Sequence, residues 1–380
     1  MREPDSRPFY DLPSAMVDEL LDRSTVAGKR ILERLRRYAA EREILRRRLR
    51  DLALVARKEA LPPVPAPTTA ATDGSYAVER LLGVDFLATA AVAVEGITPP
   101  GETRYWPEPR HRVYLEEAPH DEGSSVVLRA YMLGLELSLA MEAPHQVVFL
   151  DGSITLPVIY WNQALVRLVS TRLEVAERFR DELELFLHLY RLVLRAGRSD
   201  RQMVALPKYS TRRELAERLG VEADDRALLS LLLEAGEYTV PLSFEQPRSP
   251  WHLGLERLPD PLQKRLKPLV KEVLPSLNEV RVVYYRPRPW LPALRIEMAA
   301  AIAKNPQRLA TVLEAVANQC QVPSMLEPYP LYLADRLVKS LPRSIPTFRQ
   351  VATQAVAEGY GGDLGEVYFA LHGYRSESGG

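Results

Sequence analysis

The spacing of apolar residues predicts a long helix near the start of the chain, from residue 14 to about residue 60. This segment contains strong helix formers, and its apolar residues recur at intervals of three and four. The stripe consists of Ile31, Leu35, Tyr38, Leu45, Leu49 and Leu52. It is narrow and is interrupted by Arg42, so we expect a helix that packs along a domain or against a second copy of the chain.

A proline-rich connector, LPPVPAP at residues 61–67, separates this helix from the remainder, because prolines remove backbone donors and favour extended conformations. We therefore divide the chain into residues 1–67, a main domain of residues 68–341, and a C-terminal helix and tail of residues 342–380. The main domain is expected to carry a helical insertion at about residues 158–275. Residues 376–380, which contain serine and glycine, are expected to be frayed.

Strands and helices alternate along the main domain. A strand, a tight turn at residues 73–75 and a second strand at residues 82–94 are expected first. Further strands are predicted at residues 146–150, 202–206, 280–285 and 293–298. Helices are predicted at residues 123–143, 158–168, 171–196, 212–219, 226–234, 306–320, 329–340 and 348–357. This order predicts an α/β domain in which helices flank a central mixed sheet.

Composition narrows the class of protein without identifying it. The 380 residues are 46% hydrophobic and 26% charged, as in folded globular proteins. The single cysteine, Cys320, excludes an internal disulfide and fits a reducing compartment. The polar start of the chain is unlike a signal peptide and no uncharged run has membrane-spanning length, so we expect a cytoplasmic protein. Because the net charge is zero, affinity for nucleic acid must come from local patches.

The tripeptide Asp-Gly-Ser occurs twice, beginning at Asp73 and Asp151, each time directly after an apolar run that is expected to form a strand. A carboxylate at a strand end is held by the sheet yet faces solvent, and the glycine permits a sharp turn. Two such strands side by side bring together the oxygen ligands that Mg²⁺ and Mn²⁺ require. Asp-Gly is also a common turn dipeptide, but the repeated context favours a metal site.

Two further acids are candidates for the same site. Glu136 lies among leucines, where a carboxylate is costly unless it is paired or binds a metal, and we prefer it to Glu142 near the helix end. Asp335 lies on a predicted helix with apolar and aromatic neighbours. A surface aspartate paired with Arg336 is the alternative interpretation of Asp335.

Several segments resemble the NurA nucleases in order and spacing, over residues 70–341. They are TDGSYAVERLLGVD, LRAYMLGLELSLA, VVFLDGSITLP, VALPKYSTRREL, RIEMA and YPLYLADRL. The resemblance implies a ribonuclease H-like fold and a manganese-dependent nuclease, with Mg²⁺ as an alternative cation. It further implies a 5′–3′ exonuclease and single-strand endonuclease that acts on DNA ends and on single strands. It also implies a homodimer that works with the hexameric HerA ATPase in resection of double-strand breaks.

By the same resemblance, Asp73, Glu136 and Asp151 match the metal-binding acids, and Asp335 matches a position that is often histidine. Lys208 matches a basic position, where it would hold the scissile phosphate or balance the acids. Two divalent ions bridged by Asp73 and Asp151 are the expected catalytic arrangement, with a separation of about 3.5–4 Å.

Other functions fit the sequence less well. Residues 210–221 are similar to the opening of a helix-turn-helix, which would suit a DNA-binding protein without catalysis. The run that follows is almost wholly apolar, whereas a recognition helix presents polar side chains. A phosphatase that uses Asp151 as its nucleophile would need a second acid two residues earlier. That position is Phe149, so this function fits poorly. A coiled-coil scaffold leaves the paired Asp-Gly-Ser elements unexplained, and a phosphate loop for ATP is absent from the sequence.

Overall fold

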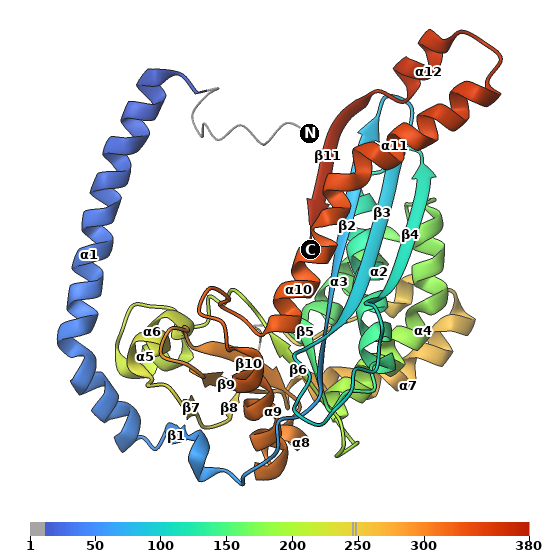
Figure 1. Ribbon diagram of the computed structural model, residues 1–380. Coiled ribbons are helices and arrows are strands. Elements are labelled where there is room, and N and C mark those ends of the chain that lie inside the picture. The colour runs from blue at the N-terminus through green and yellow to red at the C-terminus, as the bar shows by residue number, and fades with distance from the viewer. Residues whose placement is uncertain (1–11, 245–246, 248, 380) are drawn as a thin grey trace. The chain divides into compact units, whose positions relative to one another are not determined.

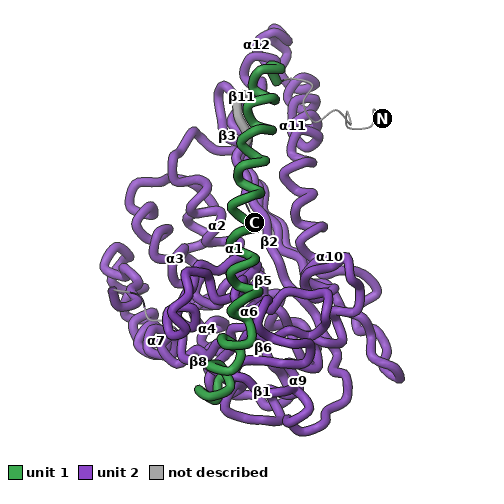
Figure 2. Tube along the Cα trace, turned by 90° about the vertical axis from the view of Figure 1, so that its left-hand side faces the viewer, with its two compact units in different colours: residues 1–54 green, residues 55–380 purple. Residues whose placement is uncertain are grey.

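The computed structural model describes residues 12–379 except 245–246 and 248, and the chain divides into two compact units, residues 1–54 and 55–380 (Figure 2). In the first unit, α1 (Ser14–Asp51) is the only helix or strand among the residues described. The predicted helix extended to about residue 60, which is wrong. Ala53 adopts a left-handed conformation with φ 51°, and residues 55–57 instead form a strand that pairs with a distant part of the chain.

The described part of the second unit is built on an 11-stranded sheet (Figure 1). The strands are β1 (Val55–Arg57), β2 (Thr69–Leu81), β3 (Asp85–Glu95), β4 (Arg110–Ala118), β5 (Val147–Asp151), β6 (Gln202–Leu206), β7 (Glu237–Thr239), β8 (Leu242–Ser243), β9 (Arg281–Tyr285), β10 (Leu294–Met298) and β11 (Gly373–Gly379). The order is β1-β7-β9-β10-β6-β5-β2-β3-β4, with β8 beside β9 and β11 beside β2. Pairing of β5 with β2 and with β6 is parallel, and the other pairs are antiparallel.

Helices cover both faces of this sheet. They are α2 (Ser124–Glu142), α3 (Leu156–Arg167), α4 (Glu174–Arg195), α5 (Glu214–Leu219), α6 (Asp225–Leu232), α7 (Asp260–Leu277), α8 (Ala300–Ala303), α9 (Pro306–Gln319), α10 (Tyr329–Val338), α11 (Ser340–Gly359) and α12 (Leu364–Ala370). α2 and α10 both pack against β2 and β3, and α9 packs against β5 and β6. The predicted α/β architecture with a mixed central sheet is confirmed.

The core follows from the alternation of side chains along each strand. Val147 and Phe149 of β5 face α9, together with Val204 and Leu206 of β6. The helices α2, α3 and α4 pack together in a second layer, where buried aromatic rings meet. These rings are Trp161, Phe179, Phe186 and Tyr190.

The helix α2 is long and apolar enough to cross a membrane by length and composition alone. However, 72% of its apolar window is buried inside the protein, as in the core helix of many folded domains. This burial is explained by its packing on β2, β3 and β5 and on the helices α3 and α4.

The expected tight turn at residues 73–75 is wrong, because β2 continues through these residues as far as Leu81. The hairpin to β3 instead turns at residues 82–84. Pairing with β3 explains the continuity, since it extends along β2 from Ala70 to Arg80 without a break. The second tripeptide does lie at a strand end, and Gly152 there has a φ of 75° that suits glycine.

The expectation of a frayed C-terminal end is also wrong for residues 376–379, and residue 380 lies outside the described residues. β11 pairs antiparallel with β2, from Gly379 opposite Tyr76 to Gly373 opposite Leu81. The shorter β5 pairs with β2 only as far as Thr72, so β11 supplies backbone partners where β5 has ended. Glu377 accepts hydrogen bonds from Arg80 at 3.4 Å and Ser125 at 3.1 Å.

Truncation of the chain after His372 is predicted to lower the melting temperature by on the order of 5 °C, because the outer backbone groups of β2 lose their partners. Thermal unfolding of the full and truncated chains measures the loss, and hydrogen exchange at residues 76–81 locates it. Unchanged melting together with unchanged exchange at these residues would show that β11 does not pair with β2 in solution.

Candidate functional site

Three neighbouring strands place polar residues in one row. Thr72 of β2 lies beside Leu150 of β5, so Asp73 and Asp151 occupy the next position on each strand. Asp151 lies beside Leu206 of β6, and Lys208 follows two residues later. Because side chains alternate, these three residues face the side of the sheet that carries α9 and α10.

The helix α10 completes a carboxylate cluster above this row. Oxygen atoms of Asp73, Asp151 and Asp335 all lie within 4.8 Å of one another. Asp73 is 4% exposed, whereas the other two are partly buried. The partners of Asp335 are Lys208 and Lys339, the latter at 2.8 Å, so the alternative pairing with Arg336 is not what the structure shows. α10 therefore covers the cluster and supplies its third carboxylate.

Glu136 approaches the cluster from the opposite face of β2. Its carboxyl group lies directly over Gly74, where a Cβ atom would collide with Glu136 and with Met132. Gly74 thus allows α2 to approach the sheet closely enough to bring this acid near the row. Glu142, the other candidate, is more than half exposed and pairs with Arg112. The geometry therefore favours Glu136 as the acid from α2.

Lys208 is the cation that faces these acids. Its Nζ donates a hydrogen bond to Asp335 and lies 3.6 Å from Asp151. A further carboxylate, Glu327, lies 3.5 Å from the same Nζ. The sequence offered no motif for Glu327, and only its place just before α10 could have suggested it. Lys208 thus contacts three carboxylates, one from β5 and two from the α10 segment.

Burial and mutual repulsion set the protonation of the site. Burial, and then the negative charge of Asp151, raise the pKa of Asp73 to about 8. Burial likewise raises the pKa of Glu136, with Asp73 and Asp151 adding to the effect. For Lys208, burial alone would lower the pKa, but Asp151, Asp335 and Glu327 together raise it. Burial opposes ionisation of Asp335, but hydrogen bonds from Lys208 and Lys339 lower the pKa of this carboxyl. The lysine and Asp335 are therefore charged at neutral pH, whereas Asp73 and Glu136 are stabilised as anions only when more positive charge is supplied.

The donor set fits a hard divalent cation. All the converging ligands are carboxylate oxygens, which suit Mg²⁺ and Mn²⁺. Oδ1 of Asp151 is buried and has no hydrogen-bond partner among the described residues, so it is available to a ligand. A bound cation would also relieve the repulsion that raises the pKa of Asp73.

The segment similar to a helix-turn-helix does not present a recognition helix. Asp225 accepts hydrogen bonds from the backbone N–H groups of Leu215 and Ala216, which ties α6 to α5. Leu228, Leu229 and Leu232 of α6 are then buried in the domain. This helix therefore lacks the polar exposed face that base recognition requires.

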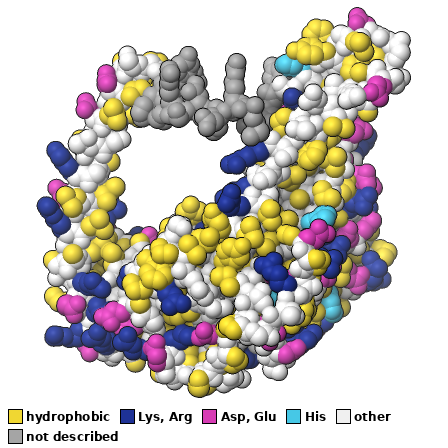
Figure 3. Space-filling model, in the orientation of Figure 1, with side chains coloured by type: hydrophobic (Ala, Val, Ile, Leu, Met, Phe, Trp, Pro, Cys, Tyr) yellow, Lys and Arg dark blue, Asp and Glu magenta, His cyan; other side chains and the backbone are white. Residues whose placement is uncertain are grey.

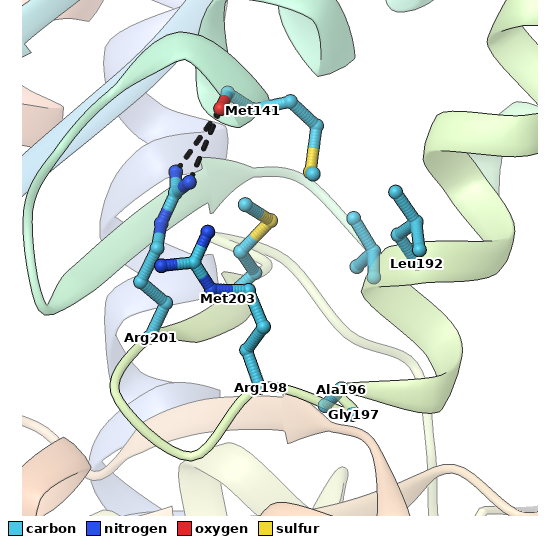
Figure 4. Close-up of a pocket in the computed structure, with 8 residues that line it drawn as sticks. Met141, Leu192, Ala196, Gly197, Arg198, Arg201 and Met203 are labelled. Carbon is cyan, nitrogen blue, oxygen red and sulfur yellow. Dashed lines mark hydrogen bonds between the residues drawn. The ribbon is translucent and has the colours of Figure 1, made fainter.

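A cavity of about 170 Å³ lies at the start of β6, away from the carboxylates (Figure 4). None of its eight lining residues is acidic. Arg201 donates hydrogen bonds to backbone oxygens of Ala140 and Met141 at the end of α2, and Arg198 pairs with Asp200. Its two arginines are thus engaged within the protein, and the cavity offers no metal ligands.

The comparisons with known proteins point to one family. Residues 67–340 match the model of the NurA domain. No curated protein matches the chain. The NurA nuclease from Sulfolobus solfataricus has a similar crystal structure, with a TM-score of 0.54 and 12% identity, over 92% of this chain and 98% of that one. A NurA structure bound to dAMP and manganese gives a TM-score of 0.45 and 16% identity, over 83% of this chain and 93% of that one.

The similarity to the Sulfolobus solfataricus structure confirms the expected fold class. This is a ribonuclease H-like mixed sheet flanked by helices, with a long N-terminal helix. The match to the family model spans the three strands and the two helices that carry Asp73, Glu136, Asp151, Lys208 and Asp335. The chain therefore belongs to the NurA family.

Proposed function

We propose that this protein is a metal-dependent deoxyribonuclease, with Asp73, Asp151 and Asp335 as its metal ligands. The observation that carries the proposal is the convergence of these carboxylates within 4.8 Å beside a lysine, on the fold of the NurA family. As the family resemblance implies, its substrates are DNA ends and single strands. It acts as a 5′–3′ exonuclease and as a single-strand endonuclease.

The cation is Mn²⁺, with Mg²⁺ as an alternative. Structures of NurA proteins contain manganese, in one case together with dAMP. In this chain, Asp73 and Asp151 would hold the cations from adjacent strands, and Asp335 would add a carboxylate from α10. Glu136 would add a carboxylate from the face of α2. The chemistry that a pair of bound divalent cations supplies is activation of water and stabilisation of the leaving oxygen.

The protein's own residues position the DNA strand. Lys208 carries its charge at neutral pH and lies next to the ligands, so its ammonium group can donate hydrogen bonds to an oxygen of the scissile phosphate. Glu327 and Asp335 hold that ammonium group from the other side. The ammonium group is thereby kept beside the carboxylate cluster, within reach of a phosphate group bound there.

Asp73→Asn and Asp151→Asn are each predicted to reduce DNA cleavage by at least about a thousandfold while leaving the fold intact. The amide keeps the shape of the side chain but loses the charge that binds the cation. Cleavage of end-labelled single-stranded and duplex DNA is measured with Mn²⁺, with Mg²⁺ and with EDTA.

A matched control for these variants is Asp181→Asn, which removes an exposed carboxylate of α4 that pairs only with its neighbour Arg180 among the described contacts. Its cleavage rate is expected to equal that of the wild type. Normal cleavage by pure Asp73→Asn or Asp151→Asn protein would exclude the proposed site.

Asp73→Asn is also predicted to stabilise the metal-free protein, and to do so more strongly at pH 8 than at pH 5. The pKa of Asp73 is about 8 in the folded protein and about 3.9 in an unfolded chain, so the wild type loses stability as the pH rises between these values. Asparagine cannot ionise and avoids this loss. Melting in EDTA should show a gain of roughly 2–6 °C at pH 8. A gain of the same size at both pH values would contradict the assigned charge state.

We propose two protein partners for this nuclease, a second copy of the chain and a HerA-type hexameric ATPase. The exposed part of the apolar stripe of α1, which includes Ile31 and Leu35, supports contact with another chain. Hydrophobic side chains also gather on the surface of α11 and α12 (Figure 3), where Tyr368 and Phe369 are more than 60% exposed. Exposed apolar patches of this kind are typical of protein interfaces.

Extensive resection of duplex DNA is predicted to need the ATPase. Opening each base pair costs on the order of 1–2 kcal/mol of stacking, and the sequence has no phosphate loop with which to couple ATP hydrolysis to that work. Digestion of long blunt duplex is followed with the nuclease alone, with HerA and ATP, and with HerA and a non-hydrolysable analogue. Only the reaction with HerA and ATP should digest the duplex extensively. Equal digestion in all three would show that no motor is required.

A further inference from the structure

A cavity of about 260 Å³ opens beside the carboxylate cluster. Lys208 and Glu327 line it and also contact each other, so they form its boundary with the proposed metal site. Its remaining walls come from the loop after β6, the start of α6, β10 and the segment before α10. A strand whose phosphate lies at Lys208 would therefore pass directly over this cavity.

Arg226 of α6 brings positive charge into the cavity, which the carboxylate of Glu327 also lines. Its Nε donates a hydrogen bond to the backbone oxygen of Ala293 at 3.1 Å, and no carboxylate lies within ion-pair distance of it among the described residues. The side chain is partly buried. A guanidinium group that is desolvated and unpaired is costly unless an anion binds to it. Arg226 is thus suited to hold a phosphate group.

Tyr209 contributes an aromatic ring at the rim of the cavity. It follows Lys208 directly, and it is 92% exposed. The walls behind it include the apolar side chains of Pro207, Leu294 and Leu331. An exposed ring beside an apolar wall is the arrangement on which nucleobases stack in proteins that bind single strands. Stacking tolerates any base, because every base has a π-face, so the ring itself would not select a sequence.

We propose that this cavity binds the nucleotide next to the scissile phosphate of single-stranded DNA. The base stacks on Tyr209, and the adjoining phosphate is held by Arg226. The small volume suits one base, below the usual size of a pocket for a larger ligand. The site therefore selects a separated strand over a duplex without selecting its sequence. This inference rests on the proposed nuclease function.

Equilibrium binding to two fluorescent strands of equal length tests the proposal, one with bases and one fully abasic. All proteins carry Asp73→Asn so that the strands are not cut. Tyr209→Ala is expected to weaken binding of the normal strand by about tenfold and to leave the abasic strand unaffected. Arg226→Gln should weaken both strands by a similar factor, because it removes a contact to phosphate. Arg226→Lys, which retains the charge, should recover part of that loss.

Tyr105→Ala is the matched control, since it removes another exposed tyrosine, between β3 and β4, and should bind both strands normally. Circular dichroism establishes that each variant is folded. Equal binding by Tyr209→Ala and the control, or an equal loss on both strands, would overturn the stacking site. Unchanged binding by folded Arg226→Gln would overturn the phosphate contact. Absence of cleavage by the protein without Asp73→Asn, with Mn²⁺ present, would instead contradict the nuclease function itself.

Discussion

The parallel register of β2, β5 and β6 is the constraint on which the candidate site depends. On β2 and β5 an apolar residue that faces the core is followed two positions later by an aspartate, as with Phe149 and Asp151. The register places Asp73 beside Asp151, and Lys208 lies two residues after the end of β6, from where its side chain reaches Asp151. The helix α10 covers these charged residues at the edge of the core. A slip of one residue in any strand would turn its charged side chain to the other face of the sheet.

Electrostatics shape the site as strongly as geometry does. Asp73 and Glu136 are each less than 10% exposed. Asp73 belongs to β2, and Glu136 of α2 lies over the neighbouring Gly74 on the other face of that strand. Two buried anions at this separation oppose folding unless they are protonated or compensated. Lys208 supplies one positive charge, and its three carboxylate neighbours exceed that charge. The carboxylates therefore carry more charge than the lysine neutralises, and this excess favours the binding of cations.

Several residues of the candidate site could be predicted from local sequence patterns. Asp73 and Asp151 follow apolar runs that form strands, and Glu136 lies on a helix that is almost wholly apolar. Asp335 was a candidate because its neighbours on a predicted helix are apolar or aromatic, and the family resemblance supported it. Lys208 came from the family resemblance alone, because nothing in its neighbours distinguishes it from a surface lysine. Their meeting depends on contacts between β6 and α10, which are more than 100 residues apart. No local pattern encodes such a contact.

Some strands and helices were not predicted from the sequence, for physical reasons. β4 is an edge strand with mostly exposed residues, so it lacks an apolar alternation. Two prolines, Pro268 and Pro275, stand inside α7 and argue against a helix, although Leu266, Val270 and Val273 bury its apolar face. β11 has the composition of a flexible tail. It becomes a strand because β2 is longer than β5 and leaves backbone groups to be paired.

The pairing of β11 with β2 brings the end of the chain close to the candidate site. Ser75, two residues from Asp73, donates a hydrogen bond from its Oγ to the backbone oxygen of Gly379 at 3.2 Å. An affinity tag or fusion partner attached after Gly380 would be separated by one residue from the end of β11, which lies beside the carboxylate cluster. A tag for recombinant protein is therefore better not attached directly after Gly380 when the site is studied.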